Sequence, residues 1–84
     1  MKYTVFLSRQ AEKFYKKLEE KLKAQVQECL IGLADPPYAG KRLHGDLKDN
    51  YSIQVRKLRI IYAILEKDKI VYVVAIGPRK KVYR

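Results

Sequence analysis

The residues with the clearest chemical potential are basic side chains that stand inside or directly after apolar, strand-like runs. Arg59 lies within one such run, residues 58–65, where a charged side chain must reach the strand end, be paired or face a site. We favour a site residue over a structural ion pair. A second run, residues 70–76, precedes a basic segment, residues 79–84, which includes Tyr83. Arginine contacts phosphate in a bidentate manner and an aromatic ring beside basic groups can stack on a base, so the pattern suits a nucleic-acid ligand.

The distribution of charge also favours a polyanionic partner. The 84-residue chain has 19 Lys and Arg residues and 9 Asp and Glu residues, a formal net charge of +10. Residues 1–39 contain seven basic and five acidic residues, a net charge of +2, whereas residues 40–84 contain twelve and four, a net charge of +8. This concentration favours a nucleic acid, an acidic protein segment or a membrane surface over charge that only maintains solubility.

Other kinds of site have less support. His44 is the only histidine, and a solvated loop residue is a better interpretation than a general base. Cys29 is the only cysteine and lies on an apolar helical stripe, which favours a core position over a nucleophile and excludes an internal disulfide. The sequence has no Cys/His cluster and no glycine-rich phosphate loop, so we expect no metal and no cofactor. Without a signal peptide or a membrane-spanning run, the expected location is the cytoplasm.

Hydrophobic periodicity predicts one strand and two helices in the first half of the chain. Residues 3–7 alternate as a strand does, and Ser8 is a suitable N-cap for the helix that follows. Apolar residues then recur at helical spacing over residues 11–33, a pattern that permits one long helix or two helices divided by a turn near Glu19–Lys21. The second helix must stop at Asp35-Pro36-Pro37, because proline disfavours helical geometry in the residue before it.

The second half of the chain has the period of two that is typical of strands. Residues 51–55, 58–65 and 70–76 form three such runs with short polar connections, which predicts an antiparallel meander. The predicted order is therefore β-α-α-β-β-β, in a single α+β domain over residues 1–84. Two N-terminal helices would pack on one face of a small, mainly antiparallel sheet and leave its other face free for binding.

Three local motifs, in this order, resemble the RelE/ParE toxin superfamily and its RelE branch in particular. They are residues 41–45, KRLHG, residues 51–62, YSIQVRKLRIIY, and residues 73–84, VVAIGPRKKVYR. The resemblance implies a type II toxin–antitoxin toxin, specifically a ribosome-dependent endoribonuclease (mRNA interferase). Such an enzyme uses the 2′-hydroxyl of the messenger RNA to attack the adjacent phosphate. It also implies a cognate antitoxin, the ribosome and mRNA as partners, operator DNA through the antitoxin, and no membrane.

The same resemblance assigns roles to particular residues. Arg59 and Arg79 match arginines that contact phosphate, and Tyr83 matches a tyrosine that stacks on the substrate or hydrogen-bonds to it; together they form the expected catalytic set. The remaining basic and polar residues of the motifs are expected to bind RNA or phosphate: Lys41, Arg42, Gln54, Arg56, Lys80, Lys81 and Arg84.

The sequence departs from the RelE pattern at Ser52 and Gln54, where well-characterised bacterial members carry basic residues. Strand alternation predicts that both side chains share a face with Arg56, but neither can take a proton at neutral pH. A general base would have to come from elsewhere, with Lys41, Lys57 and His44 as candidates. The alternative hypothesis is a non-catalytic member of the superfamily: a ParE-like topoisomerase inhibitor, or a degenerate toxin that acts only through antitoxin and operator binding.

Overall fold

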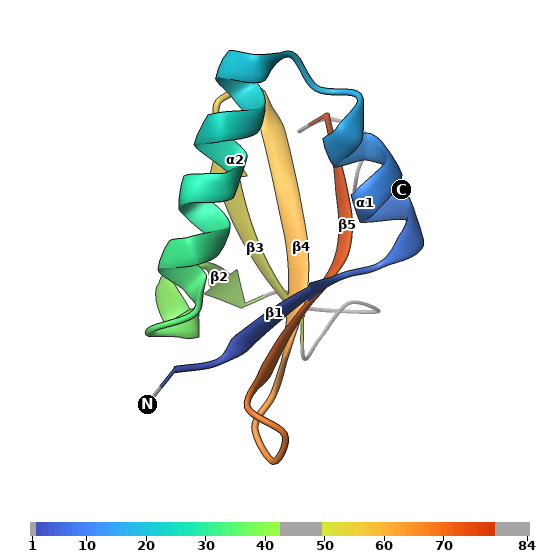
Figure 1. Ribbon diagram of the computed structural model, residues 1–84. Helices are drawn as coiled ribbons and strands as arrows, with labels where there is room; N and C mark the ends of the chain where they lie inside the picture. Colours follow the sequence, from blue (N-terminus) through green and yellow to red (C-terminus); the bar gives the residue numbers. More distant parts are fainter. Residues whose placement is uncertain (1, 43–49, 79–84) are drawn as a thin grey trace.

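The computed structural model describes residues 2–42 and 50–78 (Figure 1). In chain order its elements are β1 (Thr4–Leu7), α1 (Arg9–Lys16), α2 (Glu20–Leu33), a short 3-10 helix η1 (Pro37–Ala39), β2 (Lys41–Arg42), β3 (Asn50–Val55), β4 (Leu58–Leu65) and β5 (Ile70–Pro78). The strands form one sheet in the order β1-β5-β4-β3-β2. β1 runs parallel to β5 and every other neighbouring pair is antiparallel, which confirms the predicted α+β class and the meander.

Local sequence explains where the two helices begin and end. Ser8 is the N-cap of α1, as predicted, and its Oγ accepts a hydrogen bond from the Ala11 backbone N–H at 3.1 Å. The break between α1 and α2 covers residues 17–19, close to the turn predicted near Glu19–Lys21. α2 ends before the Asp35–Pro36 bond, because proline disfavours helical geometry in the residue that precedes it.

The hydrophobic core lies between the two helices and one face of the sheet. α1 packs mainly against β5, and α2 contacts β1 and β3, so both helices cover the same face (Figure 1). This arrangement confirms the prediction that one face of the sheet is covered by helices. The buried side chains of the core are Ala11, Val26, Leu30, Leu33, Leu58, Ile60, Tyr62, Val71, Val73 and Ile76.

Side chains at the start of α1 continue the hydrogen bonds along the edge of β5 after β1 has ended. Ser8 Oγ donates to the Val74 carbonyl oxygen at 2.7 Å, at the point where the pairing of β4 with β5 shifts by one residue. The Gln10 side-chain amide donates to the Ile76 carbonyl at 3.1 Å and accepts from the Ile76 N–H at 3.2 Å. The α1 N-terminus therefore fixes the irregular part of β5, the strand that leads into the basic segment at residues 79–84.

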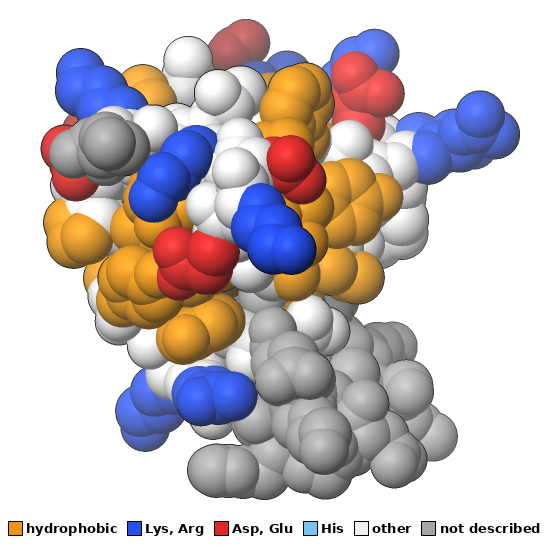
Figure 2. Space-filling view, turned by 90° about the horizontal axis from the view of Figure 1, so that it is seen from below, with side chains coloured by type: hydrophobic (Ala, Val, Ile, Leu, Met, Phe, Trp, Pro, Cys, Tyr) orange, Lys and Arg blue, Asp and Glu red, His pale blue; other side chains and the backbone are white. Residues whose placement is uncertain are grey.

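The end of the molecule at the β4–β5 turn carries charges of both signs. Figure 2 looks at this end and shows basic and acidic side chains interspersed with hydrophobic ones. The turn itself, residues 66–69, contains two acidic and two basic residues. The described residues at this end therefore do not form a uniformly basic surface. None of the helices in the described part of the chain is both long and apolar enough to cross a bilayer.

Candidate functional site

The face of the sheet opposite the helices carries the polar residues of β3 together with their partners on the neighbouring strands. In the strand register Gln54 lies opposite Arg59, and Lys41 lies opposite Ser52. Directly opposed residues in a sheet project from the same face, so these four residues share one face. Tyr51, Ile53 and Val55 of β3 pack against the core. The prediction that Ser52 and Gln54 point away from the core residues of β3 is therefore confirmed.

These residues surround a cavity of about 250 Å³ on this face, which the two helices do not cover and which is called the open face below. Arg59 Nη1 donates a hydrogen bond to Ser52 Oγ at 2.9 Å, and Ser52 is only 5% exposed. The Ser52 hydroxyl therefore helps to hold the guanidinium at the cavity wall, and the role of Arg59 as a site residue stays a prediction. Lys41 adds a second cation to the lining, so the cavity suits an anionic group such as phosphate. Its lining residues are Ala39, Gly40, Lys41, Ser52, Ile53, Gln54 and Arg59.

A buried tyrosine fixes the segment that brings Lys41 to the cavity. Tyr62 is fully buried, and its hydroxyl donates to the Pro37 carbonyl at 2.8 Å and accepts from the Gly40 N–H at 3.0 Å. Burial raises the pKa of the Tyr62 hydroxyl, although the Gly40 hydrogen bond opposes this effect, so the group stays a neutral donor at physiological pH. The sequence pattern does not indicate this arrangement, because it depends on two residues 22 positions apart.

Gly40 is required by the close approach of this segment to β3. A Cβ atom at this position would lie 2.6 Å from the Ser52 carbonyl oxygen and 2.6 Å from the Tyr62 hydroxyl. Both distances are far below ordinary van der Waals contact, so any larger residue would push β2 away from β3. The glycine therefore allows Lys41 to pair with Ser52 at the rim of the cavity.

The prediction that Arg56 shares a face with Ser52 and Gln54 is wrong. β3 ends at Val55, and Arg56 lies in the β3–β4 turn with a φ of 58°, so strand alternation no longer decides its direction. Its Nε donates to the Gln25 side-chain oxygen on α2 at 3.4 Å, on the helix-covered side of the sheet. Lys57, a candidate base, lines a cavity beside Arg56 and not the Arg59 cavity.

The remaining predicted site residues have different outcomes. Arg42 is exposed on β2 and lies opposite Tyr51, so it projects from the face opposite to that of Lys41. The other candidates lie outside the described residues: His44, Arg79, Lys80, Lys81, Tyr83 and Arg84. Their roles stay predictions.

The thiol of Cys29 has the environment expected for a packing residue. Cys29 is half-buried on α2 and contacts the core cluster. Burial raises the pKa of the thiol, which keeps it protonated and poorly nucleophilic at neutral pH. Within the described ranges, no group of three or more His, Cys, Asp and Glu side chains is placed to hold a metal ion.

Comparisons with known proteins agree with this architecture. The family model that matches residues 5–83 is that of the ParE toxin of the type II toxin–antitoxin system parDE. A protein of Escherichia coli described as RelE-like toxin is 29% identical over 83 aligned residues, which cover 96% of this chain and 87% of that protein.

Solved structures of toxins and toxin–antitoxin complexes have the same fold. The toxin–antitoxin complex RelBE2 of Mycobacterium tuberculosis matches with a TM-score of 0.85 and 27% identity, covering 94% of this chain and 100% of that one. The isolated E. coli RelE toxin matches with a TM-score of 0.78 and 26% identity, covering 96% and 90%. The archaeal RelE–RelB complex from Pyrococcus horikoshii matches in fold, with a TM-score of 0.79 and 24% identity over 98% and 100% of the two chains. The chain therefore belongs to the ParE toxin family of type II toxin–antitoxin systems, within the RelE/ParE superfamily, and is a RelE-like toxin.

Proposed function

We propose that this toxin is a ribosome-dependent endoribonuclease that cleaves messenger RNA and is neutralised by a cognate antitoxin. The observation that carries the proposal is the Arg59 guanidinium, held by Ser52 at the wall of a cavity on the open face of the sheet. Lys41 supplies a second cation to the same cavity. A scissile phosphate placed there would be stabilised by two positive charges in a partly enclosed site.

The proposed reaction needs no metal or cofactor. The 2′-oxygen of one nucleotide forms a bond to the adjacent phosphorus, and the bond from phosphorus to the 5′-oxygen of the next nucleotide breaks. The products are a 2′,3′-cyclic phosphate and a 5′-hydroxyl. Arg59 and Lys41 stabilise the charge that accumulates on the phosphate oxygens, and Gln54 offers an amide to the RNA. The proton of the 2′-hydroxyl passes to a base other than Ser52 and Gln54, with His44 as the candidate while Lys41 stays a cation. The departing 5′-oxygen takes up a proton from a general acid or from water and becomes the 5′-hydroxyl.

An antitoxin partner is supported by the complexes that share this fold. Two of the matching structures are RelBE-type complexes of a toxin with its antitoxin. The basic, open face of the sheet is a surface that an antitoxin segment would cover to block RNA. A partner that binds only the folded toxin would also stabilise it by mass action.

Inducible expression followed by primer extension on cellular mRNA tests the proposal. We expect growth arrest and cuts within translated codons, and loss of both in an Arg59→Ala, Arg79→Ala variant. Ser52→Ala should weaken cleavage about 10-fold or more, because it removes a hydrogen bond that positions the Arg59 guanidinium. The loss should stay below the ~10²–10³ in rate that follows when a preorganised donor is itself removed. Lys67→Ala, in the β4–β5 turn, is the control for loss of one positive charge and should cut normally. Arrest with no cuts in translated mRNA would reject the ribonuclease proposal.

A non-catalytic function is the alternative, and two observations favour it. The family model that matches the chain is that of a parDE toxin, and neither Ser52 nor Gln54 can act as a base. A ParE-like topoisomerase inhibitor would arrest growth and leave mRNA intact. A degenerate toxin that only pairs with its antitoxin for operator binding would cause no arrest.

A further inference from the structure

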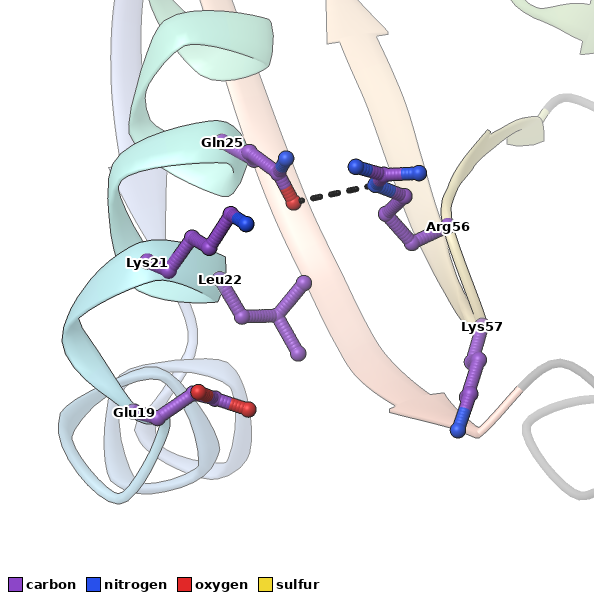
Figure 3. Close-up of a pocket in the computed structure, with 6 residues that line it drawn as sticks. All are labelled: Glu19, Lys21, Leu22, Gln25, Arg56 and Lys57. Carbon is purple, nitrogen blue, oxygen red and sulfur yellow. Dashed lines mark hydrogen bonds between the residues drawn. The ribbon is translucent and has the colours of Figure 1, made fainter.

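A second, larger cavity of about 580 Å³ lies between the N-terminal turns of α2 and the β3–β4 turn (Figure 3). It shares no lining residue with the Arg59 cavity. Its walls come from two elements that are far apart in sequence, so the cavity exists only in the folded protein. The residues that line it are Glu19, Lys21, Leu22, Gln25, Arg56 and Lys57.

The cavity has an excess of positive charge. Lys21, Arg56 and Lys57 contribute three cations to its lining, and Glu19 contributes the single carboxylate. The one ion pair among the described residues joins Lys16 to Glu12, on the surface of α1. Within the described part of the chain, the three cations of the cavity therefore form no ion pair, and the excess of positive charge in the lining favours an anionic ligand.

Arg56 is held toward this cavity at a conformational cost. Its φ of 58° lies in the left-handed region, where glycine and asparagine are favoured and other residues are strained. The side chain nevertheless crosses toward α2, where its Nε donates to the Gln25 side-chain oxygen (Figure 3). The positive φ belongs to the tight β3–β4 turn, as that of Lys69 belongs to the β4–β5 turn, and the contact with Gln25 is what directs Arg56 toward the cavity.

The rest of the lining distinguishes between two kinds of anion. Leu22 points into the cavity and offers an apolar contact (Figure 3), and α2 begins with two carboxylates, Glu19 and Glu20. The phosphates of an RNA backbone would use the cations but gain little from Leu22. A peptide carboxylate next to an apolar side chain would use both the cations and the leucine.

We propose that this cavity binds an acidic peptide segment of a protein partner. A Glu or Asp side chain of the segment contacts Arg56, Lys21 and Lys57, and an adjoining apolar side chain packs on Leu22. The inference goes beyond the ribonuclease proposal and does not depend on it, because binding alone tests it.

Nuclear magnetic resonance of the full-length, 15N-labelled toxin tests this proposal directly. The probe is an end-capped octapeptide of alternating Leu and Glu, and the matched peptide has Gln in place of every Glu. We expect saturable shifts of the Arg56 Nε–H, the Gln25 side-chain amide and the Leu22 backbone N–H with the Glu peptide only. Equal binding of the two peptides, or no shifts at these three groups, would overturn the proposal.

A pair of matched variants separates a binding role from a structural one. Arg56→Asn removes the cation and relieves the left-handed strain, so the variant should be at least as stable as the parent protein. We expect it to bind the Glu peptide about five- to tenfold more weakly, as the loss of a partly exposed charged hydrogen bond predicts.

Lys69→Asn is the control for this pair. Lys69 also has a positive φ, of 54°, and lies in the β4–β5 turn at the opposite end of β4. The control should bind the peptide as the parent does. Unchanged peptide affinity in Arg56→Asn would overturn the proposal. So would tighter, Arg56-dependent binding of octauridylate at the same resonances, because it would identify the cavity as an RNA site.

Discussion

Replacing Tyr62 with phenylalanine removes one oxygen atom from the core and tests how the core positions the candidate site. The Tyr62 hydroxyl bridges the Pro37 carbonyl and the Gly40 N–H, at 2.8 and 3.0 Å. Phenylalanine has nearly the same volume, so the ring can keep its stacking on Tyr51, with ring centroids 5.6 Å apart. The substitution therefore isolates the two hydrogen bonds that hold the segment before Lys41.

The expected loss of stability follows from the two groups that remain unsatisfied. A buried donor or acceptor without a partner costs about 1–3 kcal/mol, and the Gly40 contact is only partly buried, so Tyr62→Phe should destabilise the protein by about 2–4 kcal/mol. A domain of this size has a total stability of about 4–12 kcal/mol, so the loss is a large fraction. The unfolding midpoint should fall by about 10–30 °C.

Urea denaturation followed by circular dichroism measures this effect. Tyr72→Phe is the matched control, because Tyr72 is partly exposed on the open face and the change should stay within about 0.5 kcal/mol. A Tyr62→Phe variant as stable as this control would refute the reasoning, because the hydroxyl would then contribute nothing to the position of the Pro37–Ala39 turn.

The pH dependence of stability gives a second readout on the same substitution. Burial raises the pKa of Tyr62 in the folded state above its ordinary value of 10.0. A raised pKa means that the folded state holds the proton more tightly, so this stabilisation is complete below pH 10 and is lost as the pH rises through the folded-state pKa. The parent protein should therefore lose stability above pH 10 more steeply than Tyr62→Phe. Parallel profiles would contradict the assignment.

Three further substitutions have defined expectations. Gly40→Ala should destabilise the protein by about 1–3 kcal/mol, because its Cβ would lie 2.6 Å from the Ser52 carbonyl oxygen; urea denaturation measures the loss, and an unchanged midpoint would show that β2 can move freely. Ser8→Ala should lower the free energy of unfolding by about 1–2 kcal/mol, because it removes the cap of α1 and the hydrogen bond to the Val74 carbonyl. Calorimetry measures the loss, and unchanged stability would argue against the role of Ser8 in fixing β5. Cys29→Ser should lower stability modestly and leave growth inhibition intact; a stable but non-toxic variant would contradict the packing role of Cys29.

Most of the fold could be predicted because the local pattern and the tertiary structure agree. The run at residues 58–65 is β-branched and apolar, and β4 has these same limits. The Ser8 cap and the proline at position 36 likewise act on their immediate neighbours. The strand β2 was not predicted, because two residues carry no alternation signal and their pairing depends on the distant contact between Gly40 and Tyr62.

The candidate site could be predicted in part for the same reason. Alternation placed Ser52 and Gln54 on the open face, since both lie inside β3. Alternation failed for Arg56, because the strand ends one residue earlier and arginine is not a residue type that indicates a positive φ. The bond between Arg59 and Ser52 depends on the register of two strands, which no local pattern specifies. The second cavity likewise joins α2 to a turn more than 30 residues away.

Cleavage of mRNA on purified ribosomes is the most direct test of the central claim. The reaction would contain the full-length toxin, a ribosome complex with a defined mRNA, and a second mRNA with a single 2′-deoxynucleotide at the cut position. We predict a cut that leaves a 2′,3′-cyclic phosphate, that is abolished by the 2′-deoxy substitution and that falls at least 100-fold in Arg59→Ala, about the effect of removing a preorganised donor. An intact mRNA with active toxin, or a cut that persists in Arg59→Ala or with the 2′-deoxy substrate, would contradict the account.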